Sequence, residues 1–240
     1  MFVSGNTIHT MVKPFSIIIA LSLLCFAACT TNETSPKKNV IPSQIYFDYK
    51  IRGQETDTNV SVYLLYRMIG PGGNTIKLSD PAKVELDGET LAVDSAKLAG
   101  AFYDVEIPAK GFEGKHTIIF TDFDSKQHDV EFVYKPFKLK TKIPPMIKRG
   151  DLVFDFSGLA NEDYVRVILA DTSFLSPDIH EIDTIQNNRL TIPADKLKNL
   201  VNGPVVLLLS KEIERPVPSD TKTRGKILVS YGMQREFELR

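Results

Sequence analysis

Short runs of aromatic and β-branched residues recur along the chain from position 45, and they constrain the fold more than any other feature. In the first half these runs occupy residues 45–51, 60–66, 84–86, 103–107, 117–120 and 130–134. Several of them alternate apolar and charged positions, which is the two-residue period of a half-buried strand. Glycine, proline and asparagine separate the runs. This spacing predicts an all-β chain built from β-sandwiches.

The second half repeats the plan. Residues 152–156 and 45–49 share an aromatic-Asp-aromatic pattern, and Ile192-Pro-Ala echoes Ile107-Pro-Ala. The run at 164–169 corresponds to that at 60–66, and runs at 205–209, 227–231 and 236–239 complete the second set. The order of the runs is kept while the loop lengths differ. Tandem duplication and chance similarity of short apolar runs both remain open.

A domain boundary is predicted at residues 140–145, because Pro144 and Pro145 favour a stiff, unpaired connector. This predicts two tandem Ig-like or fibronectin III-like β-sandwich domains over residues 41–139 and 146–240. The competing arrangement is one large sandwich in which strands of both halves pair.

Helical signals are scarce. Residues 195–201 place Leu197 and Leu200 three positions apart, and Asn202-Gly203 follows as a stop signal, so one or two helical turns are expected there. Asp87-Gly88 predicts a hairpin turn, and residues 70–74 predict a hairpin tip rather than a phosphate-binding loop.

The segment before the strands has the plan of a secretory signal that ends in a cysteine. Lys13 precedes an apolar run of about 12 residues, short of the ~18–20 that a bilayer-spanning helix requires. Ala27 and Ala28 supply small residues before Cys29, although Phe26 departs from the usual aliphatic residue. We predict a signal peptide over residues 1–28 and lipidation of Cys29.

Alternatives to this assignment remain. Met11 is an alternative start, and Cys25 is a rival cysteine that follows the bulky Leu24. An ordinary secretory signal and an uncleaved anchor helix are the other interpretations. Residues 29–40 are polar and without periodicity, which predicts a lipidated, flexible tether.

Charge and cysteine content restrict the partners and the chemistry. Without residues 1–28 the chain carries 28 basic and 30 acidic residues, a formal charge of −2. This balance argues against a nucleic-acid partner, which favours a basic face. Both cysteines lie in the first 29 residues, so the predicted sandwiches have neither disulfides nor thiolates. No cofactor is predicted.

A signal with a lipidated cysteine, a polar tether and tandem sandwiches resembles the small Ig-like surface lipoproteins of Bacteroidetes-type bacteria. The resemblance implies a lipid-anchored protein of the cell envelope, at the outer membrane rather than the inner, with the membrane as a partner through Cys29. Which face it occupies stays open. The resemblance carries no functional residue beyond the cysteine.

The histidines, the acidic clusters and the motif spacing of the sequence bear on catalysis and metal binding. The histidines are His9, His116, His128 and His180, and none has metal-ligand spacing to another, so exposed loop histidines are expected. A nucleophile-elbow motif is absent, and we predict no catalytic residues. The acidic sets Asp122-Phe-Asp124 and Asn161-Glu-Asp163 are candidate calcium ligands, with solvated turns as the alternative.

Glycan binding is the main functional alternative to a non-catalytic interaction or structural protein. Sugar sites commonly stack a ring on an aromatic side chain, and the chain contains no tryptophan. The tyrosines that could replace it are Tyr46, Tyr49, Tyr63, Tyr66 and Tyr103, most of which are better explained by core or sheet-surface packing. Asp48 and Asp155, between aromatic residues, are expected to face away from the core.

Overall fold

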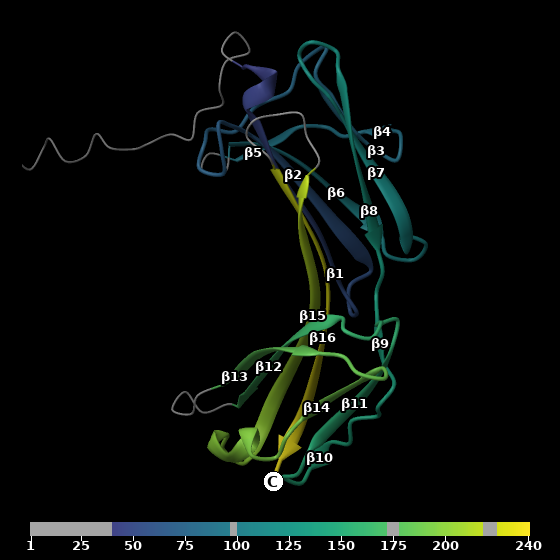
Figure 1. The fold of residues 1–240 in the computed structure, drawn as a ribbon, viewed down its shortest axis with the longest axis vertical. Coiled ribbons are helices and arrows are strands. Elements are labelled where there is room, and N and C mark those ends of the chain that lie inside the picture. Colours follow the sequence, from purple (N-terminus) through teal and green to yellow (C-terminus); the bar gives the residue numbers. More distant parts are fainter. Residues whose placement is uncertain (1–39, 97–99, 172–177, 218–224) are drawn as a thin grey trace, which may run out of the picture.

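The computed structural model describes residues 40–96, 100–171, 178–217 and 225–240. The fold is all-β, with two tandem Ig-like sandwiches, as predicted. In Figure 1 two long strands run through the middle of the molecule and join the upper unit to the lower one. The predicted signal peptide, Cys29 and nearly all of the tether lie outside the described residues.

One sheet of nine strands extends through both units. Its spatial order is β13 (Ile179–Thr184), β12 (Tyr164–Asp171), β15 (Gly203–Val217), β16 (Gly225–Leu239), β1 (Ile45–Gln54), β2 (Asn59–Met68), β6 (Gly100–Pro108) and β5 (Asp94–Ala96), with β10 (Met146–Ile147) paired to β16. Neighbouring strands of this sheet are antiparallel, except that β16 runs parallel to β1 and to β10.

Two smaller sheets cover one face of the large sheet. The upper one has the order β4 (Glu89–Thr90), β3 (Lys83–Leu86), β7 (Gly114–Thr121) and β8 (Gln127–Tyr134). The lower one has the order β14 (Arg189–Ile192), β11 (Leu152–Ser157) and β9 (Lys138–Leu139). The described residues form two short 3-10 helices, η3 (Pro42–Gln44) and η4 (Lys196–Asn199). The predicted helical turns at 195–201 are confirmed by η4, whose Leu197 is buried.

Two hydrophobic cores lie between the sheets. The upper core contains a cluster of aromatic rings, among them Phe47, Tyr49, Tyr66 and Phe120. The lower core is made of residues such as Phe154, Val167 and Leu207. In β1 and β11 the residues on either side of Asp48 and Asp155 are buried, so both aspartates face away from the cores, as predicted.

The long hairpin formed by β15 and β16 contributes to both cores. Each strand has 15 residues, and the predicted separate runs at 227–231 and 236–239 form one continuous strand. Val217, Ile227 and Val229 belong to the upper core, whereas Val205, Leu207 and Phe237 belong to the lower one. Strands of the two halves therefore pair, as the competing arrangement anticipated, while two cores persist. The division at residues 140–145 stays a prediction.

The correspondence between the halves does not extend to strand pairing. β1 pairs with β2 in the same sheet, whereas β11 pairs with β14 and β9 and lies in a different sheet from β12. Similar apolar patterns thus occupy different positions in the two units, because alternation fixes which face of a strand is buried and leaves its neighbours unspecified. The Asp87-Gly88 turn is confirmed, with φ of 50° and 91°.

Candidate functional site

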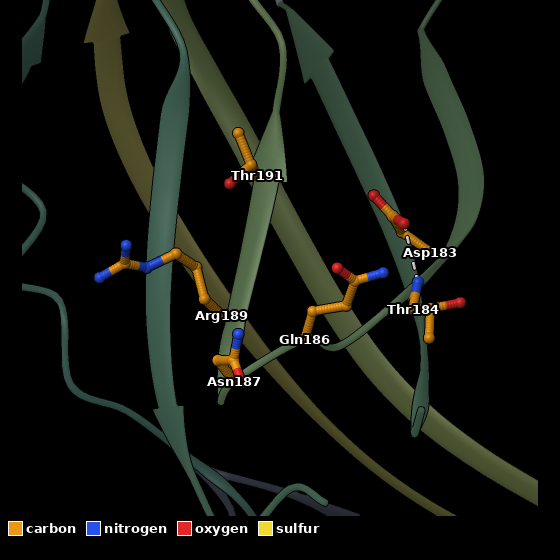
Figure 2. A pocket seen from close by; sticks show the side chains of 6 residues that line it. All are labelled: Asp183, Thr184, Gln186, Asn187, Arg189 and Thr191. Atoms are coloured by element: carbon orange, nitrogen blue, oxygen red, sulfur yellow. Dashed lines mark hydrogen bonds between the residues drawn. The ribbon is translucent and has the colours of Figure 1, made fainter. Parts of the chain in front are cut away.

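A polar hollow of about 540 Å³ lies where the chain passes from β13 to β14 (Figure 2). Its lining residues are Asp183, Thr184, Gln186, Asn187, Arg189 and Thr191. Gln186 and Arg189 exchange main-chain hydrogen bonds of 3.0 and 2.9 Å around Asn187 and Asn188, whose φ angles are 52° and 61°. These are the values of the tight hairpin turn that asparagine favours.

Neighbouring groups hold this turn in place. The Nε–H of Arg189 donates to Oδ1 of Asp155 on β11 at 2.8 Å, and Figure 2 shows the guanidinium directed away from Asp183. The N–H of Asn187 donates to Oδ1 of Asn161 at 2.8 Å. Asp183 is the one carboxylate among the described lining residues, so they do not include the two carboxyl groups that glycoside hydrolysis uses. The hollow can bind a polar molecule by hydrogen bonds.

A second candidate site lies on the outer face of the nine-stranded sheet, away from both cores. Two adjoining hollows of about 570 and 520 Å³ share Arg166, Ser210, Glu212 and Leu228. We call this surface the outer-face groove. Its other outward-facing residues are Arg52, Gln54, Tyr164, Ile168, Ile182, Leu208, Glu214, Ser230 and Gly232.

Small residues form the floor of the outer-face groove. Strand register places Ser210 between Arg166 and Gly232, and Gly232 between Ser210 and Gln54. In the adjacent row Ser230 lies between Glu212 and Arg52. Residues that are paired on neighbouring strands point to the same face of the sheet. The short side chains in the centre therefore leave a trough between the longer side chains on both sides.

Apolar and charged side chains border this trough. Tyr164 is 66% exposed and Ile182 is 60% exposed, although both lie in strands. Arg166 donates through Nε and Nη2 to the two carboxylate oxygens of Glu212, each at 3.3 Å. Nζ of Lys226 donates to Glu214 at 2.9 Å. The groove thus combines an exposed aromatic ring with paired charges.

Three of the five candidate tyrosines are core residues, as the packing interpretation holds. The Tyr49 hydroxyl donates to that of Tyr66 at 3.1 Å inside the upper core, and burial raises the pKa of both. The Tyr103 hydroxyl accepts from the N–H of Leu78 at 2.7 Å, and burial raises its pKa to about 12. Their rings are core side chains that no ligand can reach. Tyr46 and Tyr63 are half-buried on the outer face, where Tyr63 packs beside Phe102 with ring centres 5.2 Å apart.

Hydrogen-bond donors surround Asp122 in the first candidate calcium set. The carboxylate of buried Asp122 accepts from the N–H groups of Asp124 and Lys126 at 2.9 and 3.0 Å, and its second oxygen lies 2.9 Å from Nε2 of His128. Three donors thus occupy oxygens that a cation would need. The set closes the turn between β7 and β8.

Asp163 of the second candidate calcium set stabilises a loop as well. Oδ2 of Asp163 accepts from the N–H of Ala160 at 2.7 Å and pairs with Lys211 at 2.6 Å. Burial raises the pKa of Asp163, but the hydrogen bonds from Lys211 and Ala160 lower it by more, so the net shift is downward. Within the described ranges no group of three or more His, Cys, Asp and Glu residues could hold a metal ion.

The histidines are not brought together. His116 lies 2.7 Å from both Asp87 and the carbonyl of Phe112 and stacks on the Phe112 ring, whereas His128 contacts Asp122. The expectation of exposed loop histidines is wrong for these two, whose side chains are 11% exposed, and His180 alone of the described three is exposed. His9 lies outside the described residues.

Sequence reasoning missed both hollows. The Asn187-Asn188 pair between two strands was a usable turn signal for the first. The outer-face groove had no local signal, since its floor residues come from strands far apart in the sequence. Nor does any helix in the described part of the chain have the length and apolarity to cross a membrane.

Comparisons with known proteins find similar solved structures but no family. No family model and no curated protein matches the chain. Domains 3 and 4 of rat CD4 are similar at 12% identity over 74% of this chain and 98% of that one, with a TM-score of 0.30. The tandem Ig repeats of Dlar are similar at 8% identity over 82% of this chain and 98% of that one, with a TM-score of 0.23.

A bacterial protein is among the similar structures. It is SGBP-B of the Bacteroides ovatus mixed-linkage glucan utilization locus, in complex with a mixed-linkage heptasaccharide. The identity is 14% over 78% of this chain and 60% of that one, with a TM-score of 0.19. Identities and scores this low are too weak to transfer a function. The sheets and cores of the structure itself define the class, which is a tandem Ig-like β-sandwich protein.

Proposed function

We propose that this chain is a non-catalytic interaction or structural protein of the cell envelope, held at the outer membrane by lipid on Cys29. The observation that carries the proposal is the shared hairpin of β15 and β16, which joins two Ig-like sandwiches into one elongated body (Figure 1). Such a body behind a polar tether can present a binding face away from the lipid surface.

The polar clusters of the described residues support a role without catalysis. Asp122 and Asp163 are engaged by donors that close loops, and Glu212 is paired with Arg166. A general acid or base has to be free to exchange a proton with a substrate. Edge strands offer one mode of contact with a protein partner, because β13 and β5 end the large sheet and a partner strand can pair with such an edge.

The lipid anchor is tested by metabolic labelling with an alkyne analogue of palmitate in the native bacterium. Wild type and Cys25→Ala are expected to incorporate the label and to fractionate with the outer membrane. Cys29→Ala is expected to lose the label, because the acylated sulfur is missing, and to leave the membrane fraction. Equal labelling of the Cys29→Ala and wild-type proteins would contradict the anchor at this position.

A second candidate function is that of a glycan-binding lipoprotein in a polysaccharide-uptake system. The exposed Tyr164 favours it, because this ring lies in an open groove beside Arg166 and Glu212, and sugars offer both an apolar ring face and hydroxyls. Native gels cast with neutral polysaccharides test it. Retarded migration of the wild-type protein supports glycan binding, and unchanged migration in β-glucan, arabinoxylan, galactomannan and starch gels argues against it.

A further inference from the structure

We propose that the outer-face groove binds a neutral, extended oligosaccharide that crosses the strands of the large sheet from β13 to β1. The inference rests on the glycan-binding function proposed above and names its site and its ligand. Its basis is a trough that combines exposed apolar surface, paired charges and a fully hydrogen-bonded floor.

The apolar part of the groove suits the CH faces of sugar rings. Tyr164 and Ile182 lie at the β13 side, with exposed fractions of 66% and 60%, and Leu208 is 37% exposed toward the middle. Leu228 lies in both hollows. These residues come from four neighbouring strands, so the apolar surface follows the trough rather than forming one compact patch. An extended ligand can contact it along its length.

The charges of the groove suit a neutral ligand. Its lining holds two arginines, Arg52 and Arg166, and two glutamates, Glu212 and Glu214. Arg166 is paired with Glu212, and Glu214 is paired with Lys226. An anionic chain would meet the glutamates and a cationic one the arginines, whereas hydroxyl groups can accept from one and donate to the other. Ser210 and Gln54 add further neutral hydrogen-bonding groups.

The main-chain groups of the groove floor are already paired between neighbouring strands. At the floor rows β12 pairs with β15, β15 with β16, and β16 with β1. An extended peptide therefore finds no free strand edge there and would have to bind by side chains alone, which removes the main source of affinity in strand addition. Five strands at about 4.8 Å spacing give a path of roughly 19 Å, long enough for several sugar rings.

The polar hollow of Figure 2 serves as an internal comparison. Its described lining has hydroxyl, amide, carboxylate and guanidinium groups without an aromatic ring or a large aliphatic side chain. It can form hydrogen bonds with a sugar but offers nothing on which the ring face can pack. Binding of neutral glycans is therefore assigned to the outer-face groove.

Two substitutions test the groove by different routes. Tyr164→Ala removes the exposed ring, and Gly232→Leu fills the trough. A Cβ at residue 232 would lie 2.7 Å from Oε1 of Gln54, the end of a flexible side chain that can turn aside. The matched controls are Tyr63→Ala, on the same face beside Phe102, and Gln186→Ala, in the polar hollow. Thermal unfolding of each variant checks that the fold is kept.

Affinity electrophoresis with neutral polysaccharides and with anionic polygalacturonate, followed by titration with the hexasaccharide of the strongest hit, measures the effect. Tyr164→Ala and Gly232→Leu are each expected to weaken binding at least about tenfold, equivalent to ~1.4 kcal/mol, while both controls bind as wild type does. If the wild type binds a glycan and all four variants bind it with the same affinity, the groove is not the binding site, whereas the glycan-binding function still stands. Binding only to polygalacturonate would overturn the neutral ligand. Absence of binding by wild type to every polysaccharide would overturn both the function and the site.

Discussion

A fragment of residues 40–139 is expected to aggregate or remain unfolded when it is produced alone. The upper core of the intact protein includes Val217, Ile227 and Val229, which belong to the hairpin near the end of the chain. β16 also pairs in parallel with β1 from Asp48 to Gln54. Without the hairpin, the fragment has an open core and an unpaired edge on β1, both of which promote aggregation.

The free energy of unfolding that the fragment is expected to lose is large relative to the stability of a small domain. The three hairpin residues are between 0% and 9% exposed in the intact protein. Burying an aliphatic side chain contributes about 1.5–3 kcal/mol, so their removal costs roughly 5–9 kcal/mol. Natural domains have about 5–15 kcal/mol in total. Loss of the strand pairing adds to the deficit.

A fusion protein that attaches the hairpin directly to the fragment provides the control. Residues 211–231 joined through a Gly-Ser linker to the end of the fragment supply the three side chains and the pairing partner of β1. Amide NMR spectra are expected to show poor chemical-shift dispersion for the fragment and good dispersion for the fusion. A dispersed spectrum of residues 40–139 alone that overlays on the full-length spectrum would show that the hairpin is dispensable.

The complementary fragment, residues 146–240, lacks a part of its own core. Phe137 is fully buried in the lower core, and its ring lies 5.8 Å from Phe156 and 5.4 Å from Tyr231. β9, which pairs with β11, also precedes the predicted boundary. The prolines at 144 and 145 mark an irregular connection, as their chemistry indicates, but the residues that complete each core lie on both sides of it.

Local patterns were sufficient for the strands and several turns. Alternation and β-branched content located most strands of the two units, and Asp87-Gly88 located a turn whose two residues have positive φ. The pairing of β16 with β1 was beyond such patterns, because alternation along a strand determines the buried face and carries no information on which distant strand lies beside it. The parallel contact between the first and last strands is set by the packing of the whole molecule.

The candidate sites show the same limit. Tyr49 and Tyr66 have the composition of a sugar platform but occupy inward positions of β1 and β2, so the fold buries them. Tyr164 became a candidate only once the register placed Ser210 and Gly232 beside Arg166. The groove exists because small residues occupy its centre. Such a groove has no sequence signature, since serine and glycine occur throughout the chain for other reasons.

Replacing Asp122 with alanine is expected to lower the free energy of unfolding by about 3 kcal/mol, because three donors lose their hydrogen bonds to a buried carboxylate. These donors are the N–H groups of Asp124 and Lys126 and the ring of His128. Asp122→Asn is the matched control. Its amide oxygen can still accept from both N–H groups, so a loss of about 1 kcal/mol is expected. Urea unfolding at neutral pH measures both losses.

The difference between wild type and Asp122→Ala is expected to depend on pH. Burial raises the pKa of Asp122, but the hydrogen bonds from His128, Lys126 and Asp124 lower it by more, so its folded-state pKa lies below the ordinary value. The unfolded chain has the ordinary pKa of about 3.9. The ionised carboxylate therefore contributes its full stabilisation above about pH 4 and loses it as the pH falls through the lower, folded-state value.

Repeating the urea unfolding at several pH values separates this carboxylate from the other acidic groups. The gap between wild type and Asp122→Ala is expected to be constant from about pH 7 to pH 5 and to narrow below about pH 4, because only the wild type has this stabilisation to lose. Asp163, whose pKa is also lowered, is present in both proteins, so its contribution cancels in the difference. If wild type and Asp122→Ala still differ by the same free energy of unfolding at the lowest pH, the charge of Asp122 does not stabilise the turn between β7 and β8. The uncharged carboxyl group would then be sufficient.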